Sequence, residues 1–131
     1  ILLAETNARM YREPIKKLLR FLEDRQNPNG SYTYRNEGYK TCDMSQTQFA
    51  ALAMFVAKLH GFDMDVKMAK RTLDWTLNSQ SPSGGWAYML QASGNAKDPG
   101  YRPQKDPEAE DTLSMSFAGG GTAYLLSDFL Q

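Results

Sequence analysis

Two aspartates, Asp43 and Asp111, stand at equivalent positions before two strongly apolar segments, and polar side chains follow each of them closely. Carboxylate, amide and hydroxyl groups grouped in this way can form a polar rim that hydrogen-bonds a ligand. The alternative, which these positions favour, is that each aspartate caps the N-terminus of the helix behind it. The candidate ligand-binding residues are Asp43, Gln46, Gln48, Asp111, Ser114 and Ser116.

The single cysteine and the single histidine, Cys42 and His60, could bind metal or act as nucleophiles. They flank a predicted helix, so they stand about 25 Å apart, too far for one site. His60 precedes Gly61 at the expected helix C-terminus, where a cationic ring interacts favourably with the helix dipole. Cys42 has no basic neighbour that would activate its thiol, which favours an unreactive small side chain. We predict no metal and no cofactor, and no residue is assigned as catalytic.

The composition is that of a soluble globular domain. The 131 residues suffice for one domain with a core, 41% of them are apolar, and 15 acidic residues balance 15 basic ones. The lysines and arginines are scattered among acids, so we expect no nucleic-acid partner. No apolar run reaches the roughly 20 residues of a transmembrane helix, so we expect no transmembrane segment. The chain begins at Ile1, which we interpret as a processed, trimmed or partial sequence.

One phrase occurs twice: QNPNGSYTY at 26–34 and QSPSGGWAY at 80–88. The shift that places Gln26 on Gln80 also places Tyr32 on Trp86 without a gap, which identifies an internal repeat. The aromatic residues of the two phrases either pack inside the fold or form a platform for a sugar or terpene. Their recurrence in the repeat favours packing.

An amphipathic helix is expected before each phrase, over 14–26 and 64–80, with apolar residues at helical spacing on one side. The segments 45–61 and 113–131, which follow the phrases, are apolar almost all round, as in helices that are covered on most sides. The second of them contains three glycines at 119–121. These glycines permit close helix approach or ligand access, or they break the helix.

The chain is therefore predicted to be one domain, 1–131, built from two helical hairpins. Repeat 1 covers about 14–61 and repeat 2 about 62–131. A polar segment rich in glycine, proline and charge, about 90–111, is predicted to be a flexible loop. We expect a partial helix in residues 1–12. Hairpins of this kind cannot bury their faces alone and usually stack.

The segments KLLRFLEDRQNPNGSY (17–32) and RTLDWTLNSQSPSGGW (71–86) resemble the QW repeat of squalene-hopene cyclases and the wider prenyltransferase and squalene oxidase repeat group. The resemblance implies an all-α fold, an α/α toroid whose outer helices carry the motif and whose inner helices line a cavity; two hairpins give an incomplete ring. It implies that the aromatic stacks on its own outer helix while the glutamine hydrogen-bonds a neighbouring helix. The residues with this structural role are Gln26, Gly30, Tyr32, Gln80, Gly85 and Trp86.

Squalene-hopene cyclases protonate their substrate with an aspartic acid of a D-x-D-D motif, which this chain lacks. The nearest string, FDMDVK, places Asp63 and Asp65 at a helix start, where helix capping explains them. The resemblance thus implies a binding or assembly scaffold without its own complete active site. The alternative is a fragment of a squalene-hopene-cyclase-like isomerase whose catalytic acid lies outside this chain; whether the chain is an enzyme stays open.

Two kinds of partner follow from the resemblance. One is an apolar or isoprenoid ligand, and the other is a further copy of the chain or additional polypeptide that extends the incomplete ring. A sugar-active toroid such as a polysaccharide lyase is a third hypothesis. It requires basic residues grouped in the cavity, and the scattered lysines argue against it.

Overall fold

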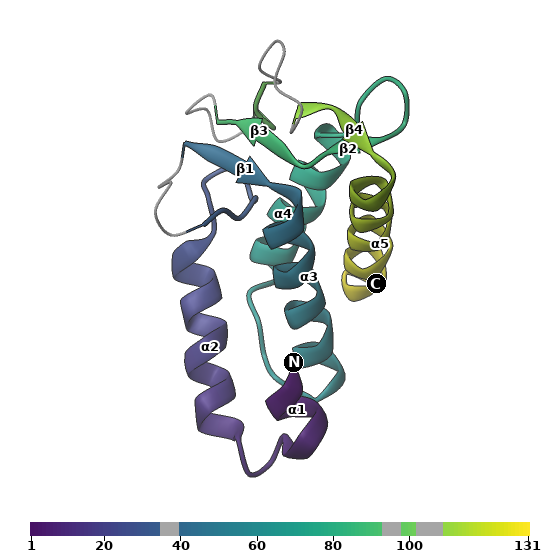
Figure 1. The fold of residues 1–131 in the computed structure, drawn as a ribbon. Coiled ribbons are helices and arrows are strands. Elements are labelled where there is room, and N and C mark those ends of the chain that lie inside the picture. The colour runs from purple at the N-terminus through teal and green to yellow at the C-terminus, as the bar shows by residue number, and fades with distance from the viewer. Residues whose placement is uncertain (35–39, 93–97, 102–108) are drawn as a thin grey trace.

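The computed structural model describes residues 1–34, 40–92, 98–101 and 109–131. Within these ranges the helices lie side by side and the short strands gather at one end of them (Figure 1). In chain order the elements are α1 (Leu2–Asn7), α2 (Arg12–Arg25), β1 (Thr41–Asp43), α3 (Met44–Leu59), α4 (Val66–Asn78), β2 (Trp86–Ala87), β3 (Met89–Gln91), β4 (Asp111–Thr112) and α5 (Leu113–Phe129).

The expectation of an all-α toroid is wrong, because the structure is mixed α/β with two small antiparallel sheets. One sheet pairs Cys42 of β1 with Leu90 of β3, and the other pairs Trp86 of β2 with Thr112 of β4. These strands have only two or three residues, which is too short to show the alternation by which a sequence reveals a strand. They form because the extended backbone around each turn is partly buried and its polar groups need partners.

Each repeat unit is a helix, a turn and a second helix, in the predicted order. Unit 1 joins α2 to α3 through the first turn (residues 26–32), and unit 2 joins α4 to α5 through the second turn (residues 80–86). Helix α5 packs against both α3 and α4, around a core that includes the fully buried Met54, Met68 and Leu126. In the described part of the chain, every helix is too short or too polar to span a lipid bilayer.

The apolar stripes expected on α2 and α4 are buried only in part. On α2 Ile15 is buried but Leu18 is 53% exposed, and on α4 Leu77 is exposed. Helix α4 instead buries Thr72 and Trp75, among others. The apolar spacing predicts that one side of each helix is buried. Helix α4 is instead contacted from more than one side, so it also buries polar side chains, which form hydrogen bonds with the groups that contact them.

The sequence predicts a flexible loop over about 90–111. The parts of this segment that the structure describes form hydrogen bonds within the segment and with α4. Gln91 and Tyr101 exchange two backbone hydrogen bonds, each 2.9 Å long. The indole Nε1 of Trp75 donates to the carbonyl of Pro99 at 2.9 Å. The remainder of that prediction, over 93–97 and 102–108, lies outside the described residues.

The glycines at 119–121 do not break a helix, because α5 runs through them. A Cβ atom on Gly119 would stand 2.3 Å from Cδ2 of Trp86, so this glycine provides the space into which the indole ring packs. Gly120 and Gly121 have open space where a Cβ would be. The prediction of a broken helix is therefore wrong, and the group that approaches Gly119 closely is the indole of Trp86 rather than a neighbouring helix.

Candidate functional site

Asp43 is fully buried at the N-terminus of α3, and its predicted capping role is confirmed. Its Oδ1 accepts hydrogen bonds from the backbone N of Gln46 at 3.0 Å and from Oγ of Ser45 at 2.6 Å. Its other carboxylate oxygen, Oδ2, has no hydrogen-bond partner among the described residues. Capping thus occupies one oxygen of this carboxylate.

Tyr88 lies beside this cap, although the sequence analysis gave it no partner. Ser45 Oγ donates to its phenol oxygen at 3.3 Å. This hydrogen bond lowers the pKa of Tyr88, but the charge of Asp43 and the hydrogen bond with Tyr34 raise it, and the net pKa lies above the usual value for tyrosine. Tyr34 and Tyr88 are equivalent in the repeat, but equivalence alone does not place two residues side by side, so no signal in the sequence indicated this contact.

Helix α5 begins one residue later in the repeat than α3 does. Its N-cap is Thr112, whose Oγ1 accepts from the backbone N of Met115 at 3.2 Å. The prediction that Asp111 caps this helix is therefore wrong. The shift that aligns the apolar faces of the two helices aligns Asp43 with Asp111, but the caps differ by one position.

Asp111 is bound to the second turn instead. It accepts hydrogen bonds from the hydroxyls of Ser81 and Ser83. A Cβ atom on Gly85 would stand 2.9 Å from Cβ of Asp111, so β4 approaches this turn too closely for a larger residue. The aspartate holds the shape of the second turn.

The other predicted rim residues point to different places. Ser116 Oγ donates to the carbonyl of Thr112 at 2.8 Å, and Ser114 Oγ lies 3.2 Å from Thr112 Oγ1. Gln46 lines a groove between α2 and α3, whereas Gln48 lines a groove between α3 and α5. The structure thus distributes the six candidates over two helix caps, one turn and two grooves.

Cys42 and His60 lie at opposite ends of α3, as the sequence indicated. Asn29 Nδ2 donates to the buried Cys42 Sγ at 3.3 Å, and His60 Nε2 lies 3.2 Å from Glu5 Oε1. Within the described ranges, histidine, cysteine and acidic side chains do not gather in threes that could hold a metal ion.

The first turn docks on α4 through Gln26 and Gly30. Gln26 Nε2 donates to the carbonyl of Met68 and to Thr72 Oγ1, both at 2.9 Å. Its Oε1 accepts from Nε of Arg71 at 2.8 Å, and Thr72 Oγ1 donates to the carbonyl of Gly30 at 2.9 Å. These contacts tie unit 1 to a helix of unit 2. We call Met68, Arg71 and Thr72 the receiving face of α4.

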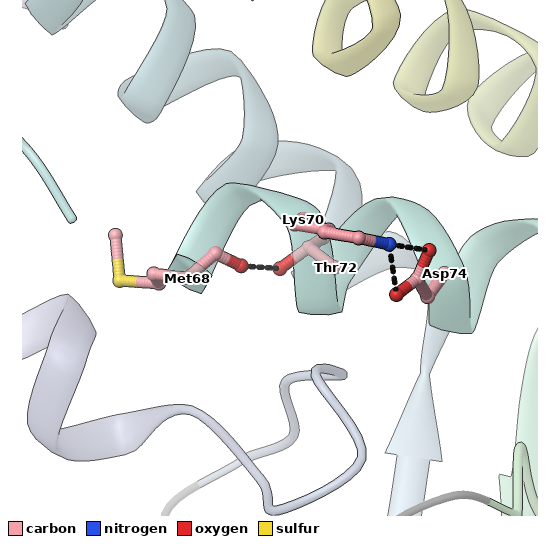
Figure 2. A network of polar contacts seen from close by, with 4 residues as sticks. All are labelled: Met68, Lys70, Thr72 and Asp74. Atoms are coloured by element: carbon pink, nitrogen blue, oxygen red, sulfur yellow. Dashed lines mark hydrogen bonds and ion pairs between the residues drawn. The ribbon is translucent and has the colours of Figure 1, made fainter. Parts of the chain in front are cut away.

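Helix α4 also carries a solvent-exposed ion pair, which Figure 2 draws together with Met68 and Thr72 of this network. Thr72 Oγ1 lies 3.3 Å from the carbonyl of Met68, one helical turn earlier. Lys70 Nζ lies 2.8 Å from a carboxylate oxygen of Asp74, also one turn apart. The two pairs are offset by half a turn, so they occupy different sides of the helix.

The second turn has the same backbone form, but the described helices that bond it, α4 and α5, both belong to its own unit. Gly84 N donates to the carbonyl of Ser81 at 2.9 Å, as Gly30 N donates to that of Asn27 at 2.8 Å. The two glycines have φ angles of 89° and 96°. The side chain of Gln80 is exposed, and its Nε2 donates to the carbonyl of Gly84 within the turn.

We expect Gln26→Ala to lower the free energy of unfolding by about 2–3 kcal/mol, because it removes buried hydrogen bonds and leaves their partners unpaired. Gln80→Ala is the matched control, since the equivalent side chain is exposed, and we expect a change within about 0.5 kcal/mol. Urea denaturation of the two variants measures both values. Equal losses in the two variants would contradict the docking of the first turn.

The aromatic residues that follow the glycines are buried. Trp86 Nε1 donates to the carbonyl of Thr76 at 2.8 Å, in the last turn of α4, the helix that precedes this turn in the chain. Tyr32 packs in the core with Met68 and Leu126, among others. Burial raises the pKa of Tyr32, and its hydroxyl has no partner among the described residues. These two side chains belong to the core rather than to a ligand platform.

Helices α3 and α5 together carry an exposed apolar face. Phe49 on α3 is 59% exposed and Phe117 on α5 is 74% exposed. Leu113 and Tyr124, also exposed, recur at helical spacing with Phe117 along the same side of α5. Between the two helices lies a groove of about 170 Å³, lined in part by Phe49, Leu52, Phe117, Gly121, Thr122 and Leu125.

The groove has one buried polar group without a partner. Thr122 is almost fully buried, and its Oγ1 has no hydrogen-bond partner among the described residues. A Cβ atom on Gly121 would meet no atom within 4 Å, so this glycine leaves the groove open. Sequence analysis raised ligand access as one role of the glycines, but it gave no role to Thr122.

Comparisons of this chain with protein-family models, with curated proteins and with solved structures find no significant match.

Proposed function

We propose that this chain is a repeat module related to the prenyltransferase and squalene oxidase repeat group, and that it is a scaffold that binds an apolar molecule. The observation that carries this proposal is the open groove between α3 and α5, beside the exposed Phe49 and Phe117. Contiguous apolar surface that is left exposed commonly marks a binding site. Further repeat units, in copies of the chain or in additional polypeptide, are its other partners.

The role of the repeat residues supports the proposed relationship. Gln26 hydrogen-bonds the helix of the neighbouring unit, and Trp86 bonds the end of its own outer helix, as the resemblance implies. Both contacts lie within one chain. They support the proposal that this chain joins its hairpins in the way that the repeat group does.

The dimensions of the groove indicate the class of ligand. Its volume of about 170 Å³ is below the roughly 300–1,000 Å³ of a typical small-molecule pocket. It therefore accommodates one segment of a longer flexible molecule, and the rest would lie along the apolar side of α5. Thr122 supplies one hydroxyl and Gln48 one amide in a lining whose other side chains are apolar or absent. A branched hydrocarbon chain with a single polar group, as in an isoprenoid alcohol, has matching chemistry.

Farnesol titration followed by tryptophan fluorescence tests this proposal. We expect farnesol to bind the native chain, and Gly121→Leu to weaken binding by at least about tenfold, because the new side chain fills the groove. The substitution is compatible with folding, since a Cβ atom at Gly121 meets no neighbour within 4 Å.

Gly120→Leu is the matched control, because Gly120 has equally open space and does not line the groove. We expect its affinity for farnesol to stay within about threefold of the native value. Absence of binding to the native chain, or equal affinity in all three proteins, would refute the proposal. Chemical conversion of farnesol by the chain would refute its restriction to binding.

A further inference from the structure

The second turn is held in a docking conformation, but among the described residues no helix of the other unit hydrogen-bonds it as α4 does the first turn. Its φ angle at Gly84 and its internal hydrogen bond match those of the docked first turn. The hydroxyls of Ser81 and Ser83 bind Asp111, which fixes the turn further. A surface that already has its bound shape loses little conformational entropy on association.

A complementary surface is exposed on α2. The repeat shift places Pro14, Lys17 and Leu18 at the positions that form the receiving face of α4. All three are exposed, and Leu18 is 53% exposed. Phe21, one helical turn further on, is 54% exposed, although its equivalent on α4 is buried. Helix α2 therefore presents the face equivalent to the receiving face of α4, but no turn within the described ranges docks on it.

We infer that the second turn of one chain docks on α2 of a second copy of this chain. In this contact the ammonium group of Lys17 donates to Oε1 of Gln80, as the guanidinium of Arg71 donates to Gln26 within one chain. Leu18 replaces the hydroxyl of Thr72 with apolar surface that the contact buries. The inference rests on the scaffold part of the proposed function and is independent of the apolar ligand.

The geometry of this contact determines the kind of assembly. The turn and the receiving face are different surfaces, so each chain offers one of each and the contact is head-to-tail. Such contacts produce rings when the rotation closes and open chains when it does not. The interface continues the order of units inside the chain, where the first turn already docks on α4.

Charge exchange across the proposed contact tests it. Sedimentation velocity over a micromolar to millimolar series of the native chain is expected to show concentration-dependent association. Gln80→Lys and Lys17→Glu should each weaken association at least about tenfold, because each places a mismatched group across the contact. The double variant Gln80→Lys/Lys17→Glu should regain affinity to within about threefold of the native chain, because the exchanged charges pair.

Lys67→Glu is the matched control, since it makes the same charge change on an exposed position of α4. We expect it to associate as the native chain does. A native chain that stays monomeric throughout the series, single variants that associate normally, or a double variant without recovery would overturn the inference. Farnesol binding measured on the same variants separates this failure from failure of the proposed function, because these residues lie outside the groove.

Discussion

Gly30→Ala is expected to lower the free energy of unfolding by about 3–5 kcal/mol, although the substitution removes no native contact. Two effects add. Gly30 has φ of 96°, which strains any residue with a Cβ atom, and that atom would stand 2.1 Å from the carbonyl oxygen of Arg71. The atoms that this Cβ would meet belong to the backbone of Arg71 and Thr72, so relief requires that the first turn leave α4.

Gly84→Ala is the control that separates the two effects. Gly84 has φ of 89°, but its Cβ atom would meet no neighbour within 4 Å. We expect a loss of about 1–2 kcal/mol from the left-handed backbone alone. Urea denaturation of both variants, at concentrations where the chain is monomeric, gives the comparison. Losses of the same size would mean that the first turn does not press against α4 as described.

Gly119→Ala is expected to lower the free energy of unfolding by about 2–3 kcal/mol, even though alanine favours a helix over glycine. Its Cβ atom would overlap the indole of Trp86, at 2.3 Å from Cδ2. The hydrogen bond from Trp86 Nε1 to the carbonyl of Thr76 holds the ring in place. A change in tryptophan fluorescence should accompany the loss, because the ring must move.

Gly120→Ala, one residue along α5, is expected to act in the opposite direction. Its Cβ atom meets no neighbour within 4 Å, so alanine adds helix propensity without a clash. The free energy of unfolding should rise by about 0.5–1 kcal/mol. Thermal denaturation of the two variants checks the signs. A destabilised Gly120→Ala would contradict the open space described at this position.

The helices and turns could be predicted from the sequence because their signals are local and repeated. The recurrence of Gln26 at Gln80 and of Tyr32 at Trp86 located both turns, and apolar spacing located the helices around them. The strands were missed because two or three residues carry too little pattern, and their pairing joins segments far apart in the chain.

The candidate site was harder to predict, because equivalence in sequence does not ensure equivalence in space. Asp43 and Asp111 align in the repeat, yet one caps α3 and the other binds the second turn. Gln26 and Gln80 also align, yet one is buried and the other exposed, since among the described residues only the first turn is hydrogen-bonded to a helix of the other unit. The sequences of α3 and α5 resemble those of helices covered on most sides, because apolar residues run almost all round each helix. The exposed face that they share could therefore not be predicted.

Side-chain amide exchange, measured by NMR on the dilute chain, tests most directly whether the first turn is docked on α4 while the second turn is largely exposed. The Gln26 amide protons are buried in hydrogen bonds to Met68 and Thr72, whereas the Gln80 side chain is exposed. We expect exchange to be at least about 100-fold slower at Gln26 than at Gln80. Equal exchange at the two glutamines would contradict this docking.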